Sequence, residues 1–166
     1  MSRVTLYGTE IPPAAIRVLR AGALTAEYQD GGLRAVRWHG VEILRGIGYL
    51  VRDTGWGTLP AALTDLWIEE DAEVFRVCWD GAVGTAYRFH AEIWGSRDGR
   101  LSFEVEGTAV EDLATCRTGF VVLHPIEGVA GEPVEVEHAD GSLETARFPK
   151  LISPGQPIAT HALRAG

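Results

Sequence analysis

The sequence is poor in basic residues and has no long apolar run. Lys150 is the only lysine, no cluster of basic residues occurs, and the net charge is −8. Nucleic acids and anionic membrane surfaces are bound through basic patches, so we expect neither as a partner. No stretch approaches the roughly 18 apolar residues of a membrane-spanning helix, and the N-terminus lacks the apolar core of a secretory signal. These absences favour a cytoplasmic protein.

Cysteine and serine are also scarce. The two cysteines, Cys78 and Cys116, stand in no spacing typical of a metal site, so no metal is predicted. We expect both to be buried free thiols, as in a reducing cytoplasm, although the spacing leaves a single disulfide open. None of the serines stands in a Gly-x-Ser-x-Gly elbow, and no glycine-rich phosphate loop opens a helix. The sequence therefore indicates no α/β-hydrolase mechanism and no nucleotide or other cofactor.

Glycine is abundant and marks turns between short alternating runs. Pairs such as Asp30-Gly31, His39-Gly40 and Asp98-Gly99 are typical of tight hairpins. Between them, apolar and polar residues alternate with a period of two, which indicates strands with one buried face. The clearest hairpins span residues 33–44, 87–105 and 134–148. Many short strands with frequent turns predict an all-β protein, an antiparallel β-sandwich.

The two ends of the chain are less regular. Residues 13–19 fit either two helical turns or a strand, and Gly22 ends the element in both cases. Several prolines follow residue 148 and break any regular element. We therefore expect a β-sandwich domain over residues 1–149 and a linker or loose tail over residues 150–166.

The loop after residue 52 is rich in glycine and contains an aromatic residue. Asp53 and Trp56 are candidates for substrate binding, because an indole can stack on a sugar ring and a carboxylate can accept hydrogen bonds from hydroxyls. The alternative is that Trp56 caps one end of the core. With five tryptophans in the chain, exposed rings would favour a carbohydrate-binding module and buried rings would count against it.

The run 117–128 is an apolar stretch flanked by polar residues. It predicts a buried strand that starts at Arg117 and ends at His124, because Pro125 has no N–H and favours extended geometry for the residue before it. Glu127 follows closely. In the simplest interpretation Arg117 and Glu127 form a rim ion pair and His124 is a hydrogen-bonded end residue. His124 and Glu127 could also approach His138 and form a metal site.

Five segments of the chain resemble the N-terminal part of the D-apionate lactonase family: residues 1–10, 18–22, 40–47, 51–58 and 117–125. The likeness extends from residue 1 to about Pro149. It implies hydrolysis of a branched-sugar lactone, D-apionolactone, to its open acid in bacterial apiose breakdown. It also implies a sugar lactone or other carbohydrate as ligand. Members of the family continue into a barrel-like domain, so we expect a C-terminal catalytic domain beyond this chain.

Lactone hydrolysis needs an activated water and stabilisation of an oxyanion. His124 has the right pKa range for a general base, Glu127 could orient it, and Arg117 could stabilise the developing negative charge. We therefore predict His124, Glu127 and Arg117 as catalytic residues. Two other classes of function stay open: a non-catalytic carbohydrate-binding or domain-interaction module, and a sandwich that dimerises through an unpaired edge or an exposed apolar face.

Overall fold

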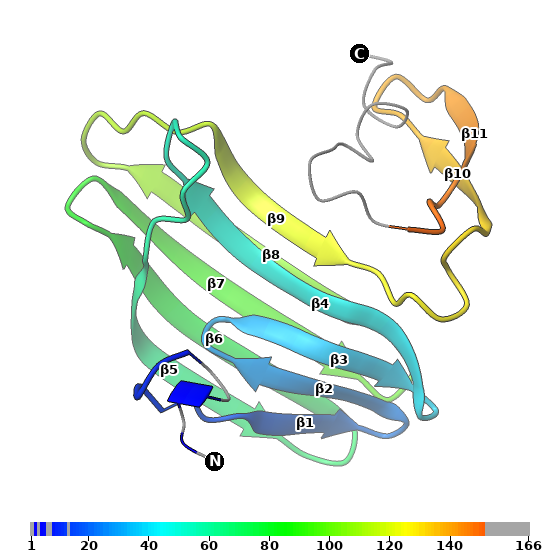
Figure 1. Ribbon diagram of the computed structural model, residues 1–166. Coiled ribbons are helices and arrows are strands. Elements are labelled where there is room, and N and C mark those ends of the chain that lie inside the picture. Colours follow the sequence, from blue (N-terminus) through cyan, green and yellow to red (C-terminus); the bar gives the residue numbers. More distant parts are fainter. Residues whose placement is uncertain (1, 3, 6–7, 13, 152–166) are drawn as a thin grey trace. The chain divides into compact units, whose positions relative to one another are not determined.

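The computed structural model describes residues 2, 4–5, 8–12 and 14–151, and almost all of its regular structure is β-strand (Figure 1). The chain divides into two compact units, Met1–Leu123 and His124–Gly166. None of the described helical residues belongs to a helix long and apolar enough to cross a bilayer. The expected linker or tail lies almost wholly outside the described residues and stays a prediction.

The first unit is an antiparallel β-sandwich, as predicted. One sheet has the order β1-β2-β3-β4-β9 and consists of β1 (Arg17–Ala21), β2 (Leu24–Gln29), β3 (Gly32–Trp38), β4 (Val41–Arg52) and β9 (Arg117–Leu123). The other has the order β5-β6-β7-β8 and consists of β5 (Ala62–Glu70), β6 (Val74–Val83), β7 (Tyr87–Ser96) and β8 (Leu101–Ala109). Figure 1 shows the two sheets as two layers.

The core lies between these sheets, and the strands contribute to it through every second side chain. Both sheets contribute side chains with less than 2% exposure: Leu19, Leu24, Leu33, Val36, Phe75, Val77, Trp79 and Ile93. Burying a side chain of this size stabilises the fold by about 1.5–3 kcal/mol. The predicted buried face of the 87–105 hairpin is confirmed on β7, where Tyr87, Phe89, Ala91 and Ile93 are buried, and β6 shows the same alternation.

Turn chemistry sets the register of the hairpins. Asp30-Gly31 joins β2 to β3 and His39-Gly40 joins β3 to β4, and all four residues have positive φ. Two-residue turns of this kind match the twist of the flanking strands. The predicted hairpins over residues 33–44 and 87–105 are confirmed by the β3–β4 and β7–β8 pairings. Residues 13–19 fitted either a helix or a strand, and from Arg17 onward the structure has a strand. Pro13 lies outside the described residues.

Glycines in the second sheet make room for aromatic rings on the neighbouring strand. Phe75 is paired with Gly95, and Gly81 is paired with Phe89. A Cβ added at Gly95 or Gly81 would lie 2.2 Å or 2.0 Å from the Cζ atom of its partner ring. Each ring therefore covers a glycine, and the two buried aromatics fit into the core only because that glycine has no side chain.

Strand β9 is an edge strand, so the prediction that it is buried was wrong. Among the strands that the structure describes it pairs only with β4, and Phe120 and Val122 are 41% and 43% exposed. The apolar run 119–123 is typical of a strand with both faces covered, but three of these five residues are exposed. Its predicted end is correct, because the ladder stops at Leu123, just before His124-Pro125.

The second unit contains a small two-stranded sheet. Strands β10 (Pro133–Glu137) and β11 (Leu143–Arg147) form the third predicted hairpin. At its turn, the Asp140 carboxylate accepts hydrogen bonds from the backbone N–H and the hydroxyl of Ser142. The His138 ring lies 3.2 Å from a Glu144 carboxylate oxygen on the same hairpin.

The two cysteines are free, but neither is buried as expected. Cys78 is half-buried in β6, and Cys116 is exposed in the loop before β9. Alternation explains Cys78, since its neighbours Val77 and Trp79 point into the core. Cys116 is exposed because it lies in the loop just before β9, which begins at Arg117.

Candidate functional site

The loop that follows β4 is organised around one carboxylate. Oδ1 of Asp53 accepts hydrogen bonds from the backbone N–H groups of Gly55 and Gly57, at 2.8 and 2.9 Å. The Asp53 N–H donates in turn to the carbonyl of Gly57 at 2.9 Å. A Cβ at Gly57 would lie 2.6 Å from Asp53 Oδ2, so a larger residue there would displace the Asp53 carboxylate. Asp53 thus holds the loop through Oδ1, and its predicted contact with substrate stays a prediction.

Trp56 stands at the tip of this loop in an unusual backbone conformation. Its φ is +68°, which is rare for a bulky residue and is retained only where the surroundings hold it. Its N–H donates to the Asp53 carbonyl, and its own carbonyl accepts a hydrogen bond from the Arg52 guanidinium at 2.9 Å. The side chain is 58% exposed. Trp56 therefore does not cap the core, and the loop presents its indole to solvent.

Arg117 meets this indole from the neighbouring strand. Its guanidinium carbon lies 5.6 Å from the ring centroid of Trp56, within the range of a cation–π contact. The β4–β9 pairing causes the approach, because Arg117 is the register partner of Arg52. Three of the predicted site residues, Asp53, Trp56 and Arg117, thus come together in the first unit. The result is an exposed aromatic ring with the Arg117 guanidinium beside it.

The other two predicted residues belong to the second unit. His124 is exposed, and its ring centroid lies 5.2 Å from that of Phe148. Glu127 is exposed in the turn that follows, and no hydrogen bond joins it to His124 among the described residues. Arg117 stands at the opposite end of β9 from Leu123, about 20 Å along the strand at roughly 3.3 Å per residue. The combination of His124, Glu127 and Arg117 stays a prediction.

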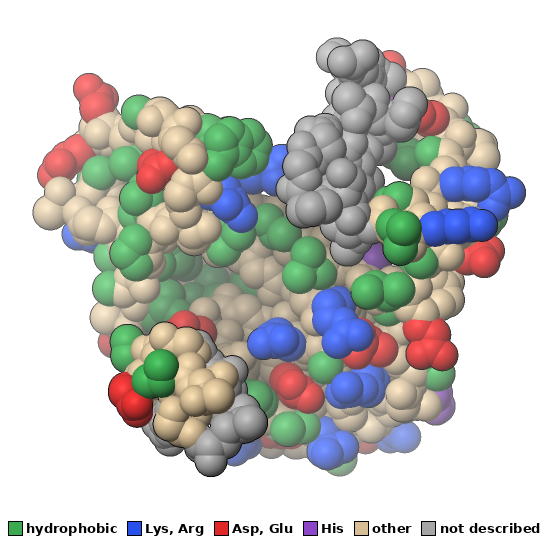
Figure 2. All heavy atoms as spheres, in the orientation of Figure 1, with side chains coloured by type: hydrophobic (Ala, Val, Ile, Leu, Met, Phe, Trp, Pro, Cys, Tyr) green, Lys and Arg blue, Asp and Glu red, His purple; other side chains and the backbone are tan. Residues whose placement is uncertain are grey.

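A cavity of about 270 Å³ opens between the sheets beside the same loop. Its lining includes Thr58 and Leu59 from the loop, Tyr49 from β4 and Trp79 from β6. Figure 2 shows it as a hollow with hydrophobic side chains on its floor. The buried indole N–H of Trp79 has no hydrogen-bond partner among the described residues. The cavity lies just below the usual 300–1,000 Å³ of drug-sized sites, so its volume suits a small ligand.

Tyr49 joins this cavity to the core. Its hydroxyl lies 2.5 Å from that of Tyr87. Burial, and then the hydrogen bond with Tyr87, raise the pKa of Tyr49 above its ordinary value. The phenol is therefore neutral near pH 7 and is not available there as a general base.

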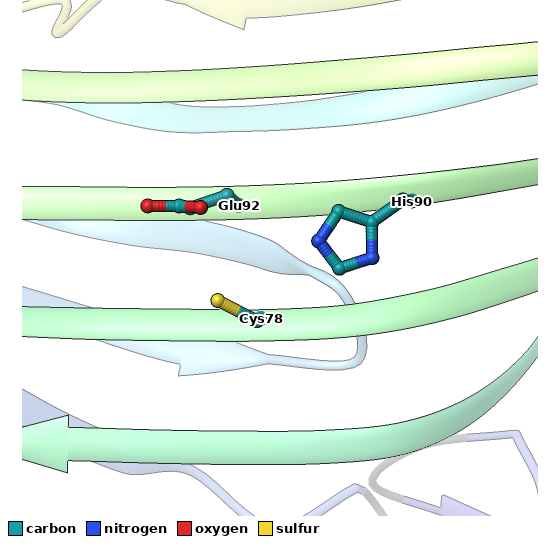
Figure 3. A group of neighbouring side chains, drawn as sticks. All are labelled: Cys78, His90 and Glu92. Atoms are coloured by element: carbon teal, nitrogen blue, oxygen red, sulfur yellow. The ribbon is translucent and has the colours of Figure 1, made fainter.

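Sequence reasoning missed a group on the outer face of the second sheet. Cys78, His90 and Glu92 place their ligand atoms within 4.8 Å of one another (Figure 3). Burial, and then the negative charge of Glu92, raise the pKa of the Cys78 thiol, which argues against a thiolate nucleophile. The period-two pattern could have revealed this group, because it predicts which residues of each strand point outward.

The family described as D-apionate lactonase, N-terminal domain, matches residues 4–164. The chain belongs to this family. It is 40% identical over 157 residues to a D-apionate lactonase of Brucella anthropi, an alignment that covers 92% of this chain and 26% of that protein. The chain thus spans about a quarter of its relative's length. No solved structure matches it.

Proposed function

We propose that this chain is the carbohydrate-binding N-terminal domain of a lactone-hydrolysing enzyme. The enzyme would open a branched-sugar lactone, D-apionolactone, to its acid in bacterial apiose catabolism. Membership of the D-apionate lactonase N-terminal family and the similarity to the Brucella anthropi protein support the substrate class. The main support for a binding role of this domain is Trp56, whose exposed ring is held in place by the loop and has Arg117 beside it.

The loop suits a sugar-sized ligand for two physical reasons. An indole offers a rigid apolar face to the C–H groups of a sugar ring, with little conformational freedom to lose on binding. The guanidinium of Arg117 donates hydrogen bonds to hydroxyls, to a lactone carbonyl or to the carboxylate of the opened acid. Because Asp53 and the glycines hold the loop before ligand arrives, the ordering cost of binding is small.

The chemistry of the proposed reaction can use groups at the start of the second unit. Water attacks the lactone carbonyl carbon, the ring C–O bond breaks, and the products are a carboxylate and a hydroxyl. In the proposal, Nε2 or Nδ1 of His124 accepts the proton of the attacking water, and Glu127 orients the ring. Arg117 lies beside Trp56, about 20 Å along β9 from the end of the strand that precedes His124, so it is assigned to ligand binding, and its predicted stabilisation of the carbonyl oxygen stays a prediction. These three roles rest on residue type and sequence proximity.

A C-terminal catalytic domain is part of the proposal, because the chain covers only 26% of its relative. In that arrangement this domain binds or orients the sugar, and the remaining machinery lies elsewhere. The second candidate is a carbohydrate-binding module with no part in catalysis, favoured by the two tryptophans that are about half exposed, Trp56 and Trp67. A cytoplasmic location fits the two free thiols.

Binding is tested by titrating this chain with D-apionolactone and with its open acid, followed by NMR. Trp56→Ala is expected to weaken binding about tenfold, equivalent to roughly 1.4 kcal/mol. Trp67→Ala is the matched control, since Trp67 is 47% exposed and has Arg76 6.0 Å from its ring centroid on the other sheet. Unchanged binding in Trp56→Ala, or equal loss in both variants, would contradict the proposed location.

Catalysis is tested by following the acid released on lactone opening. The assay compares this chain with the full-length Brucella anthropi protein as a positive control. Turnover by this chain that is lost in His124→Ala, with an unchanged melting temperature, supports the His124 role. Turnover retained by His124→Ala contradicts it. Binding without turnover supports a binding domain that works with a separate catalytic domain.

A further inference from the structure

The outer face of the second sheet carries a group of metal-ligating side chains from two paired strands. Cys78 and Asp80 lie on β6, and Glu92 and His90 lie opposite them on β7. These residues alternate with the buried Val77, Trp79, Ala91 and Ile93. All four therefore project from the same face of the sheet, away from the core and away from the Trp56 loop residues.

The imidazole of His90 is already oriented as a metal ligand would be. Its Nδ1 lies 2.7 Å from Oδ1 of Asp80, an arrangement in which Nδ1 carries the proton and donates it. The other ring nitrogen then keeps a free lone pair, and in Figure 3 it points toward the side of Cys78 and Glu92. A carboxylate on the second nitrogen of a histidine ligand is the usual device that fixes its tautomer and direction.

We propose that Cys78 Sγ, His90 Nε2 and a Glu92 carboxylate oxygen form a zinc site, with water as the fourth ligand. Thiolate, imidazole and carboxylate are the ligands that Zn²⁺ takes, at about 2.0–2.3 Å. Tetrahedral ligands at those bond lengths are roughly 3.3–3.8 Å apart. The observed atoms lie within 4.8 Å of one another, so rotation of the Glu92 and Cys78 side chains closes the site without moving the backbone.

Arg76 competes for this site. Its guanidinium makes two hydrogen bonds of 2.7 Å to the Glu92 carboxylate. Zinc must share or displace this contact, which lowers the affinity below that of a closed structural site. Removing the guanidinium while keeping the ligands should therefore tighten zinc binding. The prediction distinguishes zinc bound at Cys78, His90 and Glu92 from zinc adsorbed nonspecifically, because nonspecific adsorption would not depend on Arg76.

The site is tested with Zn²⁺ and with Co²⁺ as a spectroscopic probe, on the metal-free chain. We expect one zinc per chain by calorimetry, and a thiolate-to-cobalt charge-transfer band with Co²⁺. Cys78→Ser should abolish the band and weaken zinc binding at least tenfold. Cys116→Ser, which changes the other free cysteine, should leave both unchanged. Asp80→Asn should weaken binding about 10–100-fold by loosening His90, and Arg76→Gln should strengthen it.

Circular dichroism and melting curves of each variant verify that the sheet still folds. Absence of zinc binding at micromolar to millimolar metal overturns the proposal. So does a cobalt band that survives Cys78→Ser or disappears in Cys116→Ser. Affinities that are the same in the wild type, Asp80→Asn and Arg76→Gln would show adsorption only, and would equally overturn it.

Discussion

Gly95→Ala is expected to destabilise the sandwich, because the Phe75 ring occupies the space above Gly95. A Cβ at position 95 would lie 2.2 Å from Cζ and 2.5 Å from Cε1 of Phe75. Non-bonded carbon atoms prefer about 3.5–4.0 Å, so the ring must move by roughly 1 Å or more. Phe75 is fully buried, and the surrounding core is closely packed. Forcing extra atoms into such a core typically lowers the free energy of unfolding by about 1–3 kcal/mol.

The measurement is the unfolding free energy in urea, supported by the melting temperature. For a protein of this size, 1 kcal/mol corresponds to about 2–4 °C, so Gly95→Ala should melt about 2–12 °C lower. Gly48→Ala is the matched control, because no heavy atom lies within 4 Å of the added Cβ and the backbone φ is not in the left-handed region. That substitution restricts mainly the unfolded chain and should stabilise by about 0.4–1 kcal/mol.

The two substitutions therefore have opposite expected signs, although both replace a strand glycine with alanine. A Gly95→Ala protein as stable as the wild type would show that the core around Phe75 yields easily, and the packing argument would be wrong. Equal destabilisation in Gly48→Ala would point to a general effect of the extra methyl group in strands, and not to the ring.

Three further outcomes are expected. Backbone hydrogen bonds lower the pKa of Asp71, so its stabilising effect is present above its ordinary pKa of 3.8 and is lost as the pH falls through the folded value. In Asp71→Asn the free energy of unfolding, measured by urea titration, should therefore fall less steeply below about pH 4 than in the wild type. The same fall with pH in both proteins would contradict this. Tyr49→Phe should remove a late step from the absorbance titration of the tyrosines, because burial and Tyr87 raise the pKa of Tyr49, whereas an unaltered curve would speak against that environment. Asp53→Ala should speed hydrogen exchange of the loop amides around Trp56, measured by mass spectrometry, and loop protection equal to that of the wild type would disprove the carboxylate's role.

Much of the fold was predictable because strands and tight turns leave local patterns. The alternation over residues 87–105 predicted both strands and the buried face of β7, and Asp30-Gly31 and His39-Gly40 predicted two turns. The same alternation extended to β6 also places Cys78 and Asp80 on the outward face. Their register opposite Glu92 and His90 follows from a short connection of three residues. That group was therefore within reach of sequence reasoning.

The sequence predicted which residues form the candidate site, but not which of them lie close together. Arg117 is distant in sequence from Trp56, and the two meet because β9 pairs with β4. Pairing between distant strands depends on how all strands compete for partners, which no local pattern records. For the same reason the apolar run of β9 was misjudged as buried, since composition does not reveal whether a strand is central or at an edge.

The sequence by itself determined the class of the fold, because a period of two together with glycine turns permits little else than antiparallel strands with one buried face. It also carried the likeness to the D-apionate lactonase family. Only the tertiary structure decided that Asp53 holds a loop, that Trp56 faces solvent beside Arg117, and that β9 lies at an edge. Local patterns act through neighbouring residues, whereas these features arise from contacts between segments far apart in the chain.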